Sequence, residues 1–409
     1  MIKILHLADL HIGMENYGRL DPNTGLHSRL LDYLERFDEA IAFGMEEQVD
    51  LVVIAGDIYK NRTPNPTHQR EFARRINQLR SAGVPVFILT GNHDISASLG
   101  KAHSIEIFDA LTVEGVTIAD RLRTHLIPTR SGPVQIIALP WVTRHALLTR
   151  DEMRLASFGE IEAELRRRIE RFIEGAVANL DPNIPTILAV HATVEGAEVG
   201  AERSITLGQD LVFTRSTLAR PELDYVAMGH IHRHQAIGQH PPIVYPGSIE
   251  RIDFGEREEQ KGCVLVELER NNTRWRFHPL AARPFISIEV DIRESSDPAA
   301  RITAAIARHH LAQAIVRLDV AATREQTAHL REDVLRTQLE TAGAFLVAAI
   351  TFTVERTTRG RFGDTTQELL DGLTPRRALE LYLKSKQTDP ARMELLLAAA
   401  DELIAQPGD

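Results

Sequence analysis

The sequence is poor in the features that build disulfide-stapled, thiolate-bound or membrane-spanning proteins. Its 409 residues include a single cysteine, Cys263, and one thiol cannot form an intrachain disulfide or a cluster of thiolate metal ligands. No apolar run reaches the roughly 18 residues that a transmembrane helix needs. The first residues lack the long apolar segment and cleavage site of a signal peptide. We therefore expect a soluble, cytoplasmic protein.

An excess of positive charge is also missing. The chain carries 47 Lys and Arg against 57 Asp and Glu, a formal net charge of −10. This balance argues against broad electrostatic adhesion to nucleic acid, but not against a local basic groove or a site where metal ions supply the positive charge. Hydrophobic residues make up 43% and charged residues 25%, as in ordinary globular proteins. The length suggests two or three domains.

The first two thirds of the chain alternate short apolar runs with helical patterns. This alternation indicates βαβ units, in which buried parallel strands have nearly continuous Val, Ile and Leu. The predicted strands are 2–7, 51–55, 84–89, 134–139, 186–190, 225–228 and 243–245, and the predicted helices are 27–47, 67–81 and 160–178. Residues 262–268 and 275–277 are expected to form a closing hairpin.

The pattern changes near Arg283 and Pro284. Beyond this point, predicted strands at 285–292, 315–320 and 345–354 alternate with predicted helices at 299–310 and 326–341, an order that can form a small separate α+β domain. Further on, 365–370, 375–383 and 390–404 are predicted as short helices with Leu and Ala faces. We expect an α/β protein with domains at 1–282, 283–358 and 359–409.

Asp, His and Asn follow directly after five of the predicted strands. The segments are Asp9-Leu10-His11, Gly56-Asp57, Gly91-Asn92-His93-Asp94, His191 and Gly229-His230-Ile231-His232. Because ligands bind outside the carboxyl ends of parallel strands, these side chains are expected to meet at one edge of the sheet. The glycines allow the sharp backbone turns that this placement needs. In Gly-His-Ile-His, alternate positions of an extended segment would put both imidazoles on one face.

This set has the composition of a two-metal site. Carboxylate and amide oxygens and imidazole nitrogens suit divalent ions such as Mn, Fe or Zn. Two ions about 3.5–4 Å apart can share a carboxylate, polarise a phosphoryl oxygen and activate a water molecule. Taken singly the pieces are weaker, since Asp-Leu-His can be structural, Gly-Asp is often a turn with a helix cap, and His191 alone decides nothing. Gly-Asn-His-Asp is more specific, because a turn needs Gly-Asn but has no use for His-Asp.

Taken together and in this order, the motifs resemble the calcineurin-like metallophosphoesterase superfamily. The closer similarity is to the SbcD nuclease subunits of bacteria and their archaeal and eukaryotic relatives, the Mre-eleven family. It is carried by ILHLADLHIG, TGNHD, VHATVEGAE, DYVAMGHIHRHQ and YPGSIERIDFGE, and beyond Arg283 by domain order. The resemblance implies a metallophosphoesterase β-sandwich flanked by helices, then a small α+β capping domain that faces DNA, and a C-terminal helical tail.

The resemblance also implies a role for each site residue. One ion would be held by Asp9, His11 and His232 and the other by Asn92, His191 and His230, with Asp57 bridging them. His93 would stabilise or protonate the scissile phosphate without binding metal, and Asp94 would orient it from behind. At one position the chain departs from the archaeal members, which have a second His where this sequence has Lys60. A lysine there can still contact phosphate as a cation.

The function that the resemblance implies is a two-metal DNA nuclease. With Mn²⁺ as the expected metal, it would act as an exonuclease on double-stranded ends and an endonuclease on single strands or hairpins, in double-strand break repair. The expected partners are DNA and an SbcC-type ATPase of the SMC family, in a heterotetramer built on a homodimer and associated with the nucleoid. The last helices would dock on the ATPase coiled coil through their apolar side chains, which are Leu379, Leu383, Leu395, Leu396 and Leu403.

Alternatives stay open at this point. The apolar faces of the last helices can instead pack back on the protein as an ordinary bundle. A metallophosphoesterase that hydrolyses a small phosphodiester or nucleotide fits the same motifs, although it needs neither an extra α+β domain nor a helical tail. A non-catalytic scaffold would lack at least one type of metal ligand, and none is missing.

Overall fold

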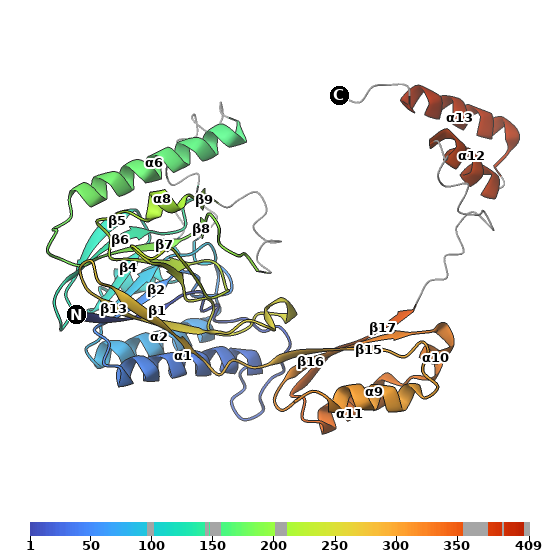
Figure 1. Cartoon of the computed structure of the whole chain (residues 1–409), viewed down its shortest axis with the longest axis horizontal. Helices are drawn as coiled ribbons and strands as arrows, with labels where there is room; N and C mark the ends of the chain where they lie inside the picture. Colours follow the sequence, from blue (N-terminus) through green and yellow to red (C-terminus); the bar gives the residue numbers. More distant parts are fainter. Residues whose placement is uncertain are drawn as a thin grey trace. The chain divides into compact units, whose positions relative to one another are not determined.

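The computed structural model describes residues 1–95, 102–143, 147, 157–200, 211–354, 375–386 and 388–404. These residues form two compact units (Figure 1). The first consists of Met1–Ile288, Ala305–Leu318 and Glu332–Ile350, and the second of Glu289–Ala304, Asp319–Arg331 and the described part of Thr351–Asp409. Among the helices in these ranges, none combines the length and the apolar composition that crossing a membrane requires.

The first large sheet is built around the amino-terminal strand. Its order is β14-β13-β1-β2-β3-β4, where β1 to β4 are parallel and β13 and β14 are an antiparallel edge. The strands are β1 (Ile2–Leu7), β2 (Leu51–Ala55), β3 (Val86–Leu89), β4 (Val116–Ala119), β13 (Gly262–Leu268) and β14 (Arg274–Pro279). Helices α1 (Ser28–Glu46) and α2 (Pro66–Ser81) cover its outer face (Figure 1).

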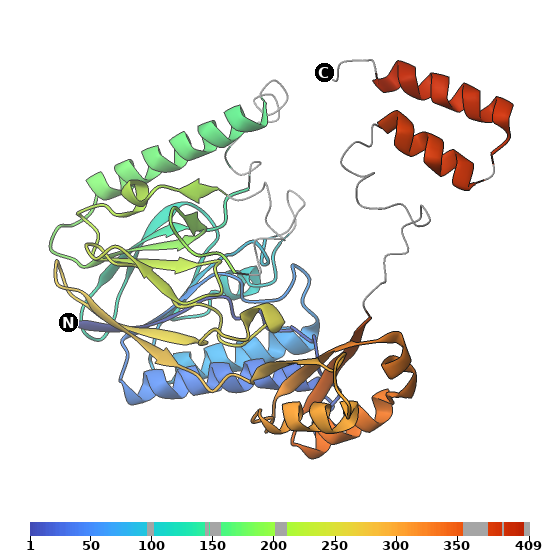
Figure 2. The ribbon, with the colours of Figure 1, turned by 45° about the vertical axis from the view of Figure 1, so that its right-hand side comes forward.

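The second large sheet has the order β11-β12-β10-β7-β6-β5. Its four central strands are parallel and its two edge strands are antiparallel. The strands are β5 (Arg123–Ile127), β6 (Val134–Leu139), β7 (Thr186–His191), β10 (Tyr225–Gly229), β11 (Gln235–Ile237) and β12 (Ile243–Tyr245). Helix α6 (Phe158–Ala178) begins with a capping box between Ser157 and Glu160 and lies on the side away from α1 and α2 (Figure 2).

The two sheets pack face to face, which explains the uninterrupted apolar runs. In β2, Val52 and Ile54 point into the core beneath α1 and α2. Leu51 and Val53 point the other way, into the apolar layer between the sheets. A strand that is buried on both faces has no polar side to display. The expected β-sandwich flanked by helices is confirmed, although the strand ends that carry the motifs belong to two sheets and not to one sheet edge.

After β14 the chain forms a three-stranded sheet of order β15-β16-β17. Its strands are β15 (Phe285–Asp291), β16 (Ile315–Ala322) and β17 (Leu346–Val354), and its helices are α9 (Pro298–Ala307), α10 (Arg324–His329) and α11 (Glu332–Thr341). The single helix predicted over 326–341 is wrong. Leu330 has an extended backbone (φ −84°, ψ 130°), and a new helix then begins with Glu332 and Asp333, acids that suit a helix N-terminus.

The last described segments are α12 (Pro375–Ser385) and α13 (Pro390–Ile404), as predicted. The helix predicted over 365–370 lies outside the described residues. Smaller elements complete the first unit: α3 (Glu106–Ala110), the short parallel pair β8 (Thr193–Val194) and β9 (Val212–Phe213), α8 (Arg215–Leu218) and the 3₁₀ turn η1 (Phe254–Glu256).

Candidate metal centre

The predicted site residues come together where the carboxyl ends of both sheets converge. Asp9 and His11 follow β1, Asp57 follows β2, and Asn92 to Asp94 follow β3, all in the first sheet. His191 ends β7 and the pair His230 and His232 follows β10, in the second sheet. At Gly229 the two sheets approach so closely that an added Cβ would lie 1.9 Å from the Ala55 carbonyl oxygen. Only glycine fits this approach.

The backbone at the site is turned sharply at several ligand candidates. Asp9, His11, Asp57 and His230 have φ of 52°, 42°, 53° and 97°. Residues other than glycine rarely adopt such values, and they cluster at functional sites where the surrounding structure holds them. The expectation that His230 and His232 share one face of an extended segment is therefore wrong, because the chain leaves the strand at Gly229 and turns at His230.

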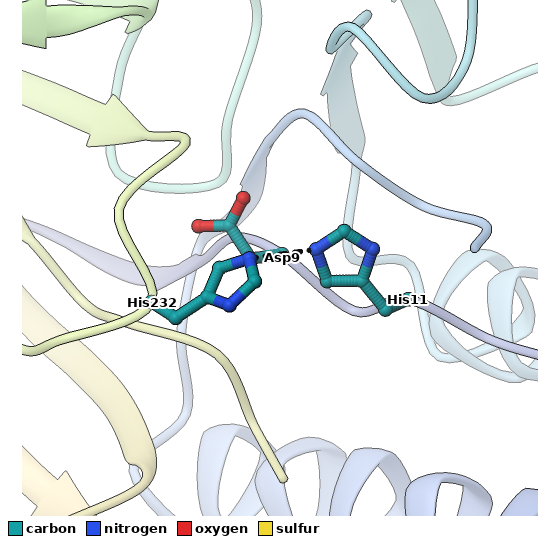
Figure 3. A group of neighbouring side chains, drawn as sticks. All are labelled: Asp9, His11 and His232. Carbon is teal, nitrogen blue, oxygen red and sulfur yellow. Dashed lines mark hydrogen bonds between the residues drawn. The ribbon is translucent and has the colours of Figure 1, made fainter. Parts of the chain in front are cut away.

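The first candidate group contains Asp9, His11 and His232, whose ligand atoms lie within 4.8 Å of one another (Figure 3). The planes of the two imidazoles are inclined at 69°, and their Nε2 atoms lie 2.9 Å apart. The Asp9 carboxylate also accepts the backbone N–H of His230 at 3.0 and 3.1 Å. This bond ties the loop after β10 to the loop after β1.

The second candidate group contains Asp57, His191 and His230. His191 Nε2 lies 3.4 Å from Asp57 Oδ2. The amide oxygen of Asn92 lies 3.0 Å from His191 Nε2 and 3.1 Å from His230 Nδ1. A third group, His11, Asp57 and His93, overlaps with the other two. Asp57 therefore lies between the two sets of ligand candidates.

Hydrogen bonds on the far side of two imidazole rings set which nitrogen faces the site. His191 donates from Nδ1 to the Ala55 carbonyl oxygen at 2.7 Å, and His232 donates from Nδ1 to Glu256 Oε1 at 2.8 Å. In the neutral form of each ring the proton is then on Nδ1, and Nε2 carries the lone pair that can bind a cation, which is the arrangement expected of metal-ligating histidines. With oxygen donors from Asp9, Asp57 and Asn92, the residues fit divalent metal ions.

Burial and neighbouring charges shift the pKa values of three groups in the site. Burial raises the pKa of the Asp9 carboxyl. For Asp57 burial acts in the same direction, but His191, His93 and His11 together outweigh it and hold the pKa of the Asp57 carboxyl well below its ordinary value. At His191 burial lowers the imidazole pKa, but Asp57 outweighs it and the pKa rises to about 9. A divalent cation would replace protons held between these groups.

His93 and Asp94 differ in what they contact. His93 is one third exposed, and its Nε2 lies 4.0 Å from Asp57 Oδ2. Its Nδ1 donates to the Lys60 carbonyl oxygen at 2.6 Å. Asp94 is buried and accepts the backbone N–H groups of Gly91 and Ile58 at 2.9 and 3.0 Å. Burial and the nearby Asp57 raise the pKa of Asp94 to about 7. Asp94 thus clamps the loops after β2 and β3.

Sequence reasoning assigned no role to Glu256 and Lys261. Both are almost completely buried beside His232, and Glu256 receives the His232 Nδ1 hydrogen bond. In the sequence they are ordinary charged residues, which are exposed in most proteins. The only available signal was the position of Glu256 at the end of the motif YPGSIERIDFGE.

Curated relatives of the chain carry nuclease and repair names. It is 28% identical over 275 residues to the SbcD subunit of nuclease SbcCD from Escherichia coli strain K12, covering 65% of this chain and 64% of that protein. It is 27% identical over 309 residues to the DNA double-strand break repair protein Mre11 of Archaeoglobus fulgidus, covering 71% and 62%. It is 26% identical over 294 residues to the SbcD subunit from Staphylococcus epidermidis, and this alignment covers 71% of this chain and 72% of that protein. The first two matches span less than two thirds of the relatives' own length.

A solved dimetal phosphatase from Danio rerio aligns over 68% of this chain and 96% of its own at 10% identity, with a TM-score of 0.38. The family model for calcineurin-like phosphoesterases matches residues 2–234, more than half of the chain. This range contains all seven predicted metal ligands. The chain belongs to the calcineurin-like phosphoesterase family.

Proposed function

We propose that the chain is a two-metal DNA nuclease, with exonuclease action on double-stranded ends and endonuclease action on single strands or hairpins. The position of Asp57 is the observation that supports a site for two metal ions. Its carboxylate belongs to one candidate group with His191 and His230, and its Oδ2 lies 3.9 Å from Nε2 of His11, which belongs to the candidate group with Asp9 and His232. A carboxylate placed between two ligand sets is the feature that two ions sharing a bridge require.

In this proposal Asp9, His11 and His232 would hold one ion, Asn92, His191 and His230 would hold the other, and Asp57 would be shared between them. Divalent ions held there would supply Lewis-acid polarisation of a phosphoryl oxygen and would lower the pKa of a water molecule. Mn²⁺ suits this mixture of oxygen and nitrogen donors.

In this proposal His93 acts on the scissile phosphate without binding a metal ion. Because Nδ1 donates to the Lys60 carbonyl oxygen, Nε2 is turned toward Asp57, and in the doubly protonated imidazolium form it can donate to a phosphate oxygen or to the leaving group. The Lys60 ammonium supplies a cation at the same loop. Asp94 keeps this loop in place through its bonds to the backbone after β2 and β3.

DNA as the substrate is supported by the relatives, which are named as nuclease subunits and as a DNA break repair protein. The chain would accordingly act in double-strand break repair as the nuclease component of an SbcC–SbcD complex, in the cytoplasm at the nucleoid. Residues 283–358 would form a capping domain that shapes the DNA path. The domain at 1–282 would contain the nuclease site. The domain at 359–409 would make the contact with the partner.

The partner contact is supported by the last two helices. Leu383 of α12 and Leu397 of α13 are buried, whereas Leu395 and Leu396 are 72% and 41% exposed. Exposed leucines on a helix are suited to a partner's apolar groove, here the coiled coil of an SbcC-type ATPase. The assembly proposed is a heterotetramer built on a homodimer.

The test is cleavage of a labelled linear DNA duplex and a labelled hairpin with Mn²⁺, with and without EDTA, alone and with the SbcC-type partner. We expect cleavage that EDTA abolishes. The control is Glu174→Gln, which removes a carboxylate that is 61% exposed on α6 and lies 3.2 Å from Arg220; this variant should cleave like the wild type. No cleavage of either DNA in the presence of the partner would refute the nuclease.

The alternative is hydrolysis of a small phosphodiester or nucleotide by the same centre. Bis-p-nitrophenyl phosphate distinguishes the two functions. Turnover of this ester with intact DNA, even after addition of the partner, would favour the alternative, because the metal chemistry would then be present without DNA cleavage.

A further inference from the structure

A buried ion pair lies directly behind one of the candidate metal ligands. The side chains of Glu256 and Lys261 are 2% and 0% exposed. Glu256 Oε2 and Lys261 Nζ are 2.8 Å apart. Removing two charges from water is costly, and such a pair contributes little to stability compared with apolar side chains of the same size. A buried pair at this place therefore calls for a role other than stability.

The pair holds His232 at both its ring and its backbone. Glu256 Oε1 accepts the hydrogen bond from His232 Nδ1 at 2.8 Å. Lys261 Nζ donates to the His232 carbonyl oxygen at 3.1 Å. Because ring and backbone are both held, the rotation of the imidazole is restricted, and its Nε2 stays 2.9 Å from His11 Nε2.

Glu256 is itself held firmly. Its Oε2 also accepts the backbone N–H of Ile252 at 3.0 Å. It ends the turn η1, whose Phe254 packs edge-on against Phe285 with ring centroids 5.0 Å apart and against Tyr17 at 5.4 Å. Lys261 Nζ lies 2.8 Å from Glu256 Oε2, and the His232 ring and the Ile252 N–H both donate to the Glu256 side chain. A nearby ammonium and two donors favour the ionised form, so the group that faces the imidazole is a carboxylate.

We propose that Glu256, held by Lys261, is a positioning residue that fixes His232 with Nε2 toward the metal centre and so sets the affinity for the ion on the Asp9, His11 and His232 side. The carboxylate keeps the proton on Nδ1 and makes the imidazole a better donor to a cation, which are the two effects that partners behind a ligand exert. The inference rests on the proposed metal-binding role of His232.

The chain contains a matched control for this role. Glu259 Oε2 lies 2.7 Å from the same Lys261 Nζ, so Glu256→Gln and Glu259→Gln each remove one negative charge next to that lysine. Of the two carboxylates, Glu256 is the one that accepts the His232 imidazole hydrogen bond. A difference between the variants therefore isolates the contact with His232 from a general charge effect.

The experiment is calorimetric titration of the full chain with Mn²⁺ alone, which needs neither DNA nor turnover. We expect the wild type and Glu259→Gln to bind two ions with similar affinities. Glu256→Gln should bind one of the two ions about 10–100-fold more weakly, the usual effect of removing such a partner. Equal affinities for Glu256→Gln and Glu259→Gln would overturn the proposal.

Two further measurements distinguish failure of this proposal from misfolding of the variant and from failure of the metal centre. If Glu256→Gln does not fold by circular dichroism, the double variant Glu256→Gln with Lys261→Met removes both buried charges, and the same loss of affinity for one ion is expected. A double variant that binds both ions like the wild type would overturn the role of Glu256. A wild type that binds no Mn²⁺ would instead overturn the metal centre itself, so failure of the proposed function is recognised separately.

Discussion

Replacing Gly229 with alanine should damage both the fold and the metal centre, because this residue lies where the two sheets meet. A Cβ at position 229 would be 1.9 Å from the Ala55 carbonyl oxygen, 3.0 Å from the Ala55 carbonyl carbon and 2.9 Å from His191 Nδ1. Two of these atoms belong to backbone, which cannot rotate away as the end of a flexible side chain can. Relief requires β10 to move away from the end of β2.

The magnitude follows from what that movement breaks. Overpacking in a dense core destabilises by about 1–3 kcal/mol. Separating β10 from β2 also strains the bond between His191 Nδ1 and the Ala55 carbonyl oxygen, now 2.7 Å, and a buried polar group left without its partner costs about 1–3 kcal/mol. We expect Gly229→Ala to lower the free energy of unfolding by about 2–6 kcal/mol, the sum of both.

The assay is urea unfolding monitored by circular dichroism, combined with Mn²⁺ titration. The control is Gly175→Ala in α6, where an added Cβ meets nothing within 4 Å. Alanine in a helix is about 0.5–1 kcal/mol better than glycine, so this variant should be slightly more stable than the wild type. A Gly229→Ala protein that unfolds at the wild-type urea concentration and binds Mn²⁺ normally would refute the close approach of the sheets.

Four further outcomes are expected, one of them with a control variant. His93→Ala should keep both ions but hydrolyse about 10²–10⁴-fold more slowly, the usual contribution of a general acid or base; a loss of metal content would make His93 a ligand. Asp57→Ala should lose both ions together in a metal analysis, whereas loss of one ion would contradict the bridge. Phe254→Ala should weaken Mn²⁺ binding by loosening η1, while Leu335→Ala, a buried truncation on α11, should not. Burial raises the pKa of the Cys263 thiol to about 12, so native protein should resist iodoacetamide at pH 8 and react once urea unfolds it.

The local sequence determined the strands of the two large sheets that are buried on both faces. Runs such as Leu51–Ala55 are apolar throughout because both faces are covered, and this makes them recognisable without an alignment. The edge strands β4 and β5 were missed for the opposite reason. Their residues are largely half-buried or exposed, so no apolar run distinguishes them from a loop.

The sequence also determined which chemical groups follow each strand, and the order of those groups was enough to identify the family. It did not determine that the strand ends belong to two sheets, since a strand buried between a sheet and helices has the same composition in either arrangement. Nor did it determine the turn at His230, whose φ of 97° depends on the bond from its N–H to Asp9, a residue distant in the sequence.

The pairing of Glu256 with Lys261 and His232 was decided by tertiary structure alone. In the sequence, a buried charge is indistinguishable from an exposed one, because burial is a property of the surrounding residues. Only when η1 packs against Phe285 and Tyr17 does the Glu256 carboxylate come to lie behind the His232 ring. The sequence thus determined the chemistry of the ligands, whereas their orientation depended on contacts between segments far apart in the chain.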